Sequence, residues 1–329
     1  MIAGRRLAAA LLTAVALAAC GGDGETASDT GEDTAAADFP SEQIRLIVPY
    51  TAGGPTDIAA RAVARFMEQE LDETVLVENI PGASGASAYQ QLIAAEPDGH
   101  TLSMFALPTA TLNYLLNDVG YAAEDFTPIG VVTRVPSAIV VPADSPYQDI
   151  EELFEAAREN PDEISIGTPG ATNTHAAETS RIKQIYDVPL TIVPFNGNSE
   201  VQAALLGNNV DAGFVNVSQD VLPNFESGAI RPLAVGSEEP LDYVDAPTFV
   251  ESEYPELTQS TTTFGIVGPA GVPEGVVTKL EDTLRAALED PEVVETLDER
   301  YVPEEFLGAE ETGELFTEVE ETFKDVTIG

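Results

Sequence analysis

The chain has 329 residues, with 57 acidic side chains against 14 lysines and arginines and a formal net charge of −43 at pH 7. This balance argues against nucleic-acid binding, which requires a basic surface. The length predicts roughly two domains with ample core. We expect the acidic surface to belong to a salt-rich habitat, because salt screens the self-repulsion of so many carboxylates.

The N-terminus predicts export. Arg5 and Arg6 precede an apolar run, 7–19, that is too short to span a bilayer. This pattern is typical of a signal peptide over residues 1–19. The run ends in Leu-Ala-Ala-Cys20, which resembles the bacterial lipobox and implies a lipid on Cys20 that anchors the exported protein to the cell membrane. The alternative is an ordinary signal peptide with an incidental cysteine.

Two further features complete this part of the chain. Cys20 is the only cysteine, so an internal disulfide is excluded. Residues 20–38 are mostly small, polar or acidic, and the segment lacks large apolar side chains. Such a segment buries too little surface to offset the entropy of ordering it, so we expect an acidic flexible tether.

The first predicted strand leads into a glycine-rich loop. Ile44 to Val48 is apolar, Gly53 and Gly54 follow in the loop, and Pro55 opens a helical pattern. Adjacent glycines let backbone N–H groups converge, and the helix adds free N–H groups and a positive dipole end. The loop therefore predicts a cradle for a small anion. A tight turn without a ligand stays open as the alternative.

Strand and helix patterns alternate after this loop, which predicts α/β layers with mainly parallel sheets. The interruption Arg134-Val-Pro136 predicts a crossing between two lobes. In chain order we expect a helix over 56–71, a strand over 75–77, a glycine-bearing turn over 78–86, a helix to 95, a strand over 101–105, an apolar run over 128–141, a helix over 149–159 and a strand over 164–167.

The second half repeats this alternation. A third special loop, Thr168-Pro-Gly-Ala-Thr-Asn-Thr-His175, precedes a helix to 186. There follow a strand over 191–195, a loop over 196–199, a helix through 206, a strand over 210–216, a helix over 221–226, a strand over 230–235, an irregular segment over 238–260, a returning strand over 263–267, and helices from 273 and over 312–325. We expect one lobe from 39–137 plus 261–329 and a second from 138–260.

These motifs, in this order and spacing, resemble the substrate-binding proteins of tripartite tricarboxylate transporters, the Bordetella uptake gene family. The resemblance covers essentially all of 44–326. It rests on Val48-Pro-Tyr-Thr-Ala-Gly-Gly-Pro-Thr-Asp57, Val77-Glu-Asn-Ile-Pro-Gly-Ala-Ser-Gly85, Pro97-Asp-Gly-His-Thr-Leu102, Val193-Pro-Phe-Asn-Gly197, Ala246-Pro-Thr-Phe249 and Phe264-Gly-Ile-Val-Gly-Pro-Ala-Gly271.

The resemblance implies a type II periplasmic-binding-protein fold with a ligand cleft between two lobes. It implies an extracytoplasmic lipoprotein that delivers a small di- or tricarboxylate-like acid to membrane permease subunits. We expect no cofactor and no transition metal, and a calcium site built from the many acids stays open, although the sequence has no Asp-x-Asp-x-Asp-Gly pattern. The implied ligand-binding residues are Tyr50, Thr51, Ala52, Gly53, Gly54, Pro55, Thr56, Asp57, Gly85, Ala86, Gly170, Thr172, Asn173, Thr174, His175 and Asn216. Helix N-termini at Pro55 and near Asn173 then face the ligand from both lobes.

The sequence departs from the family pattern at three places, which leaves the ligand open. Thr168 stands where the family usually has serine, Ala176 where it has leucine, and Phe195 where it has tyrosine. Two other functional classes stay open as well. One is a binding lipoprotein that serves another kind of importer, since such folds are shared. The other is an exported enzyme that acts on a small carboxylate.

Little in the sequence favours the enzyme. The nucleophile elbow, the phosphate loop and the zinc-protease motif are all absent from the sequence. Of the two histidines, His100 lies in a Pro-Asp-Gly turn and reads as structural. His175 begins a helix beside the expected cleft, where ligand contact and loop bracing are both open. Asp57 reads as a loop brace rather than a general base.

Overall fold

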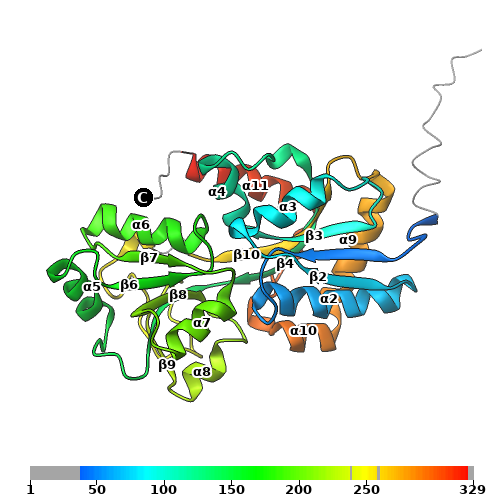
Figure 1. The fold of residues 1–329 in the computed structure, drawn as a ribbon. Helices are drawn as coiled ribbons and strands as arrows, with labels where there is room; N and C mark the ends of the chain where they lie inside the picture. Colours follow the sequence, from blue (N-terminus) through cyan, green and yellow to red (C-terminus); the bar gives the residue numbers. More distant parts are fainter. Residues whose placement is uncertain (1–37, 238, 258–259, 325–329) are drawn as a thin grey trace, which may run out of the picture.

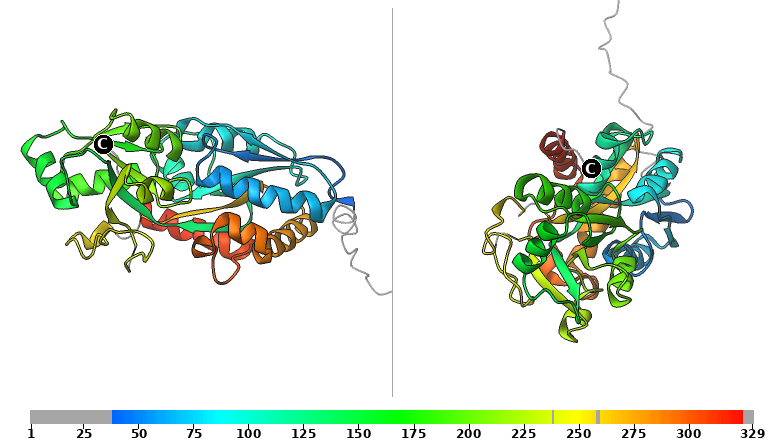
Figure 2. Two further views of the ribbon diagram at one scale, coloured as in Figure 1. Left: turned by 90° about the horizontal axis from the view of Figure 1, so that it is seen from below. Right: turned by 60° about the vertical axis from the view of Figure 1, so that its left-hand side comes forward.

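The computed structural model describes residues 38–237, 239–257 and 260–324. Two five-stranded sheets, each covered by helices, lie side by side along an elongated molecule (Figures 1 and 2). The predicted signal peptide, the lipidation at Cys20 and nearly all of the tether lie outside the described residues. Among the described residues, no helix is long and apolar enough to cross a membrane.

The first sheet has the strand order β2-β1-β3-β10-β4. β1 pairs in parallel with β2 and β3, whereas β10 runs antiparallel to β3 and to β4. Every strand but β10 therefore points the same way, as predicted for a mainly parallel sheet. The strands are β1 (Ile44–Val48), β2 (Val75–Asn79), β3 (Thr101–Leu107), β4 (Phe126–Val135) and β10 (Thr262–Pro269).

The second sheet repeats this plan in the order β7-β6-β8-β5-β9. β6 pairs in parallel with β7 and β8, and β5 runs antiparallel to β8 and β9. Here β5 is the single strand of opposite direction. The strands are β5 (Ser137–Pro142), β6 (Ser165–Thr168), β7 (Thr191–Pro194), β8 (Ala212–Asn216) and β9 (Ile230–Val235).

Helices cover both faces of each sheet (Figure 1). On the first sheet, α2 (Pro55–Leu71), α9 (Glu274–Glu289) and α10 (Pro291–Leu297) cover one face, and α3 (Ala86–Ile93), α4 (Thr109–Leu116) and α11 (Ala309–Phe323) cover the other. On the second, α5 (Ile150–Glu159) and α6 (Thr174–Tyr186) lie opposite α7 (Asn198–Leu206) and α8 (Leu222–Glu226). The 3-10 helices are η1 (Ala83–Gly85), η2 (Ala123–Asp125), η3 (Pro255–Leu257) and η4 (Glu299–Tyr301).

Most elements lie where the periodicity predicted them, and two helices were missed. α4 has 8 residues and α10 has 7, so each makes barely two turns. Apolar residues then recur too few times to show a helical period. The long α2 is the opposite case, because its buried Ala59, Val63 and Met67 repeat at helical spacing against the first core.

The chain passes between the sheets twice. β4 ends at Val135 in the first sheet and β5 begins at Ser137 in the second, with only Pro136 between them. It returns between Val235, the end of β9, and Thr262, the start of β10. The first passage lies at the interruption that the sequence singled out. Thr262, at the end of the second passage, lines the pocket described next.

Candidate functional site

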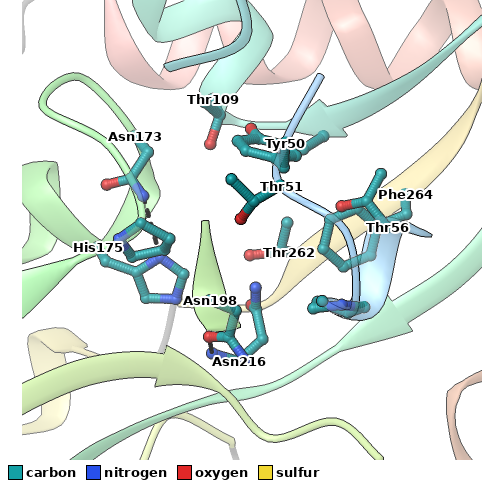
Figure 3. A pocket seen from close by; sticks show the side chains of 14 residues that line it. Tyr50, Thr51, Thr56, Thr109, Asn173, His175, Asn198, Asn216, Thr262 and Phe264 are labelled. Carbon is teal, nitrogen blue, oxygen red and sulfur yellow. Dashed lines mark hydrogen bonds between the residues drawn. The ribbon is translucent and has the colours of Figure 1, made fainter. Parts of the chain in front are cut away.

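A pocket with about 380 Å³ of empty space lies between the two lobes (Figure 3). Part of this space is open to solvent, and only about 20 Å³ of it admits the centre of a water-sized sphere, so the closed lobes leave little free room between them. The carboxyl ends of β1, β6 and β8 meet there, with β10 as a further wall. The lining residues are Tyr50, Thr51, Gly54, Pro55, Thr56, Ala106, Thr109, Pro169, Asn173, His175, Asn198, Asn216, Thr262 and Phe264.

Half of the residues singled out from the sequence line this pocket: Tyr50, Thr51, Gly54, Pro55, Thr56, Asn173, His175 and Asn216. The others lie outside the lining: Ala52, Gly53, Asp57, Gly85, Ala86, Gly170, Thr172 and Thr174. Sequence reasoning missed Ala106, Thr109, Pro169, Asn198, Thr262 and Phe264. A signal existed for Asn198, because a glycine followed by the start of a helix recurs at 197–198 as at 54–55.

The loop after β1 opens the N-terminus of α2 toward the pocket. Gly53 has a φ of 86°, a left-handed conformation that favours glycine. Gly54 is the N-cap, without a side-chain hydrogen bond to the helix, and Pro55 follows it. Pro55 has no N–H and the Asp57 N–H donates to the Gly54 carbonyl at 3.0 Å, so the Thr56 N–H is the one that this uncapped end offers to an anion.

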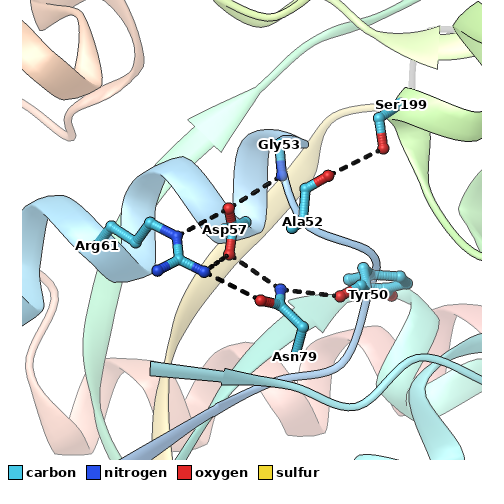
Figure 4. A network of polar contacts seen from close by, with 7 residues as sticks. All are labelled: Tyr50, Ala52, Gly53, Asp57, Arg61, Asn79 and Ser199. Carbon is cyan, nitrogen blue, oxygen red and sulfur yellow. Dashed lines mark hydrogen bonds and ion pairs between the residues drawn. The ribbon is translucent and has the colours of Figure 1, made fainter. Parts of the chain in front are cut away.

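Asp57 braces this loop from behind (Figure 4). Its carboxylate accepts hydrogen bonds from the Gly53 N–H at 2.9 Å, from Arg61 at 2.9 and 3.0 Å, and from Asn79 at 2.9 Å. Burial opposes its charge, but the bonds from Arg61, Gly53 and Asn79 together hold the pKa of Asp57 below its ordinary value. The Asp57 carboxylate therefore stays ionised, and both of its oxygens accept hydrogen bonds from within the protein. This fits its predicted role as a loop brace.

In the second lobe, the uncapped helix end at the pocket belongs to α7 rather than to α6. The side chain of Asn173 caps α6 by accepting from the Ala176 N–H at 2.8 Å. α7 begins at Asn198 without a side-chain cap. A Cβ placed on Gly54 would lie 3.7 Å from Asn198 Cβ, so the ends of α2 and α7 face each other across the cleft. The N-terminus of α6 also lies at the pocket, as expected, because Asn173 and His175 line it, but its Ala176 N–H is already capped.

His175 is held at both ring nitrogens. Its Nε2 lies 2.8 Å from Ser137 Oγ, and that hydroxyl donates to the Ser260 carbonyl at 2.5 Å. A hydroxyl has one proton, so we assign the donor role toward Ser137 to Nε2–H. Nδ1 then accepts from Asn173 Nδ2 at 3.4 Å. The chain of bonds joins the α6 cap to both passages between the lobes.

His175 is therefore a neutral brace. It is 2% exposed, and burial lowers the pKa of its imidazole to about 3. Both ring nitrogens already have partners within the protein. Of the two roles left open by the sequence, this geometry favours loop bracing over ligand contact.

The lobes touch on both sides of the pocket. Thr51 Oγ1 lies 3.2 Å from Ser199 Oγ, and the Ser199 hydroxyl also donates to the Ala52 carbonyl at 3.3 Å. On the other side, the Thr172 N–H donates to Ser84 Oγ at 3.1 Å. These contacts close the lobes around the pocket. They also explain how Ala52 and Thr172 support the site without lining it.

His100 has a structural role in its turn. Its Nε2 accepts from the Ser41 N–H at 3.0 Å, which leaves the proton on Nδ1, 3.2 Å from Asp98. Glu42 lies in the same group. Both Glu42 and Asp98 are exposed, and exposed acidic groups of this kind are common in proteins without a metal.

The sequence model of the tripartite tricarboxylate transporter family receptor matches residues 59–320. The chain belongs to this family. A Cupriavidus necator protein described as the UPF0065 protein in the gbd 5′ region is 33% identical over 260 residues, which cover 79% of this chain and 78% of that protein. The matched family is a family of receptors, so the chain is a solute-binding receptor rather than an enzyme.

Solved structures agree with this assignment. MatC of Rhodopseudomonas palustris with bound malate has a TM-score of 0.81 at 26% identity, over 87% of this chain and 99% of that one. A second R. palustris protein, solved with adipate, has a TM-score of 0.80 at 28% identity, over 87% and 96% of the two chains. Two other neighbours are described as a periplasmic transporter and as the periplasmic binding protein BugD, each with a TM-score of 0.81, which confirms the predicted two-lobed fold class.

Proposed function

We propose that this receptor captures a small carboxylate between its lobes, outside the cytoplasmic membrane, and delivers it to permease subunits of a tripartite tricarboxylate-type transporter. The observation that carries the proposal is the enclosed pocket at the facing ends of α2 and α7. Receptors of the same fold hold malate and adipate.

The pocket offers an anion neutral donors instead of fixed cations. Among the described residues that line it, none is a lysine or an arginine. Each uncapped helix end contributes roughly 0.3–2 kcal/mol toward an anion. Thr51, Thr56 and the amides of Asn198 and Asn216 add hydrogen-bond donors. Enclosed dipoles of this kind create a local positive potential even in a strongly acidic protein.

A thermal-shift screen in high salt tests the proposal. The panel contains dicarboxylates, tricarboxylates, acidic amino acids, aromatic acids and uncharged amides of the same carbon skeletons. At least one acid is expected to raise the melting temperature while its amide leaves it unchanged. Stabilisation by no acid, or by acid and amide alike, would contradict the assignment.

The proposed anchor is a lipid on Cys20. It is supported by the Leu-Ala-Ala-Cys motif behind a short apolar run. The lipid would hold the receptor beside its permease, with residues 20–38 as the tether. In cells, the wild-type protein is expected in the membrane fraction and a Cys20→Ser variant in the soluble exported fraction. Equal membrane association of both proteins would refute the anchor.

A further inference from the structure

Asp220 lies directly behind the pocket wall, in the turn after β8. Its Oδ2 accepts from Asn198 Nδ2 at 2.8 Å and from Gln202 Nε2 at 2.5 Å, and its Oδ1 accepts from Ser218 Oγ at 2.5 Å. All three donors are neutral. The carboxylate therefore organises the start of α7 and the turn after β8 around one acceptor.

Through Asn198, Asp220 fixes two residues of the pocket. Asn198 donates to Asp220, and its Oδ1 accepts from the Asn216 N–H at 3.1 Å. Both ends of the Asn198 amide are thus occupied, and its orientation in the pocket is set. Asn198 and Asn216 both line the pocket, 4% and 5% exposed (Figure 3).

The two acids behind the two helix ends differ in how their charge is balanced. Asp57, behind α2, forms an ion pair with Arg61 at 2.9 Å. Among the described residues, no lysine or arginine bonds to Asp220. Burial raises the pKa of Asp220, and the bonds from Ser218, Asn198 and Gln202 oppose that rise. The Asp220 carboxylate, one side chain away from the pocket, therefore has neutral donors but no cationic partner among the described residues.

The other titratable groups near this wall do not cancel that charge. His175, in the pocket lining, is neutral at physiological pH, because burial lowers its pKa to about 3. Burial raises the pKa of Tyr50, which also lines the pocket, and of Tyr301, which shares a second cavity with Ser218. α7 and α8 each bring one further acid, Glu200 and Glu226, and no base.

We propose that Asp220 is the specificity-determining residue of the site, holding Asn198 in place while its charge favours acids with few negative charges over tricarboxylates. The inference rests on the proposed capture of carboxylates. Every carboxylate that a ligand brings into the pocket is repelled by the same fixed charge. The repulsion therefore grows with the number of ligand charges, whereas positioning of Asn198 affects all acids alike.

Two substitutions separate the effect of the Asp220 charge from the effect of Asp220 on the position of Asn198. In Asp220→Asn the remaining oxygen still accepts from Asn198 and Gln202, and the new amide donates to Ser218, whose hydroxyl turns to the Asn216 carbonyl, 3.4 Å away. This variant loses the charge and keeps the geometry. Asp220→Ala loses both. Asp211→Asn is the matched control, because Asp211 also accepts from a serine, at the opposite end of β6 and β8.

The test is calorimetric titration at pH 7.5 with butanoate, glutarate and tricarballylate, which carry one, two and three carboxylates on the same three-carbon backbone. Asp220→Asn is expected to tighten binding by a factor that grows with ligand charge, on the order of threefold to tenfold per carboxylate. Asp220→Ala should bind each of the three acids less tightly than Asp220→Asn by the same factor, and Asp211→Asn should change none. An Asp220→Asn gain that is absent, or equal for all three acids, would overturn the proposal.

A second measurement keeps the inference independent of the proposed function. If none of the three acids binds either protein, carboxylate capture by this pocket is the part that fails. The carboxyl ¹³C resonance of Asp220 in the ligand-free protein then decides the charge. A titration midpoint above the ordinary range for aspartate but below the pH of the binding test supports an uncompensated charge, and a midpoint above that pH overturns the inference. A midpoint at or below that range overturns the inference.

Discussion

His175 gives the fold a pH dependence of predictable sign. In the unfolded chain its imidazole takes up a proton below about pH 6.5, whereas in the fold it stays neutral down to about pH 3. The unfolded state binds more protons between these values, so stability falls as the pH is lowered through this window. The contribution is at most about 1.4 kcal/mol per pH unit.

We therefore predict that His175→Gln is less stable than wild type at pH 7.5 and that this difference shrinks as the pH falls from about 6.5 to 4.5. Denaturant unfolding at a series of pH values measures it. His100→Gln is the matched control, because it removes the other histidine, which lies in a turn outside the pocket. A stability difference for His175→Gln that does not change with pH would contradict the neutral brace.

At single residues, the sequence was informative where backbone chemistry fixes the role. Asp57 follows two glycines in the first turn of a helix, so its brace was predictable, and the structure bears it out. The pairing of Asn198 with Asp220 was not predictable, because the two residues meet only when α7 packs beside the turn after β8. In the sequence, Asn198 and Asp220 look like ordinary polar residues of the surface.

At the level of elements, the site depends on the gap between the ends of α2 and α7. A Cβ on Gly54 would lie in ordinary contact with Asn198, at 3.7 Å from its Cβ and 4.0 Å from its N. The backbone there is extended, with φ −88° and ψ 176°, so a side chain fits without strain. A larger side chain would fill the space where the two helix ends offer their N–H groups.

We predict that Gly54→Ala binds the acid found in the screen within about threefold of wild type and that Gly54→Val loses at least roughly tenfold, about 1.4 kcal/mol. The alanine variant serves as the control for loss of glycine. Circular dichroism and the melting temperature establish that both variants fold. Equal affinity of a folded Gly54→Val variant would remove this loop from the site.

Element prediction succeeded where periodicity was long and failed where topology decided. Strands β1 and β8 and helix α2 could be predicted, because each is an apolar pattern bounded by turns. The pocket wall made by Thr262 and Phe264 was not, because their side of β10 faces the ligand space only once this strand lies between β3 and β4. Thr109 was missed with its short helix, α4.

At the scale of the whole molecule, the net charge of −43 predicts salt-dependent stability. Raising NaCl from about 0.1 to 2 M shortens the screening length severalfold and relieves repulsion among surface carboxylates. The melting temperature is expected to rise by several degrees, with most of the rise below about 0.5 M, where screening changes fastest. A melting temperature that stays flat over this range would refute the salt-rich habitat proposed for this protein.

The central claim is that one small acid binds between the lobes, at the facing ends of α2 and α7. Isothermal titration of the best acid from the screen tests it most directly, with wild type beside the Asn198→Ala/Asn216→Ala double variant and an Asn224→Ala control on α8. We predict one site per chain in wild type and in the control, and at least a tenfold loss in the double variant. Unchanged affinity in a folded double variant would contradict this account.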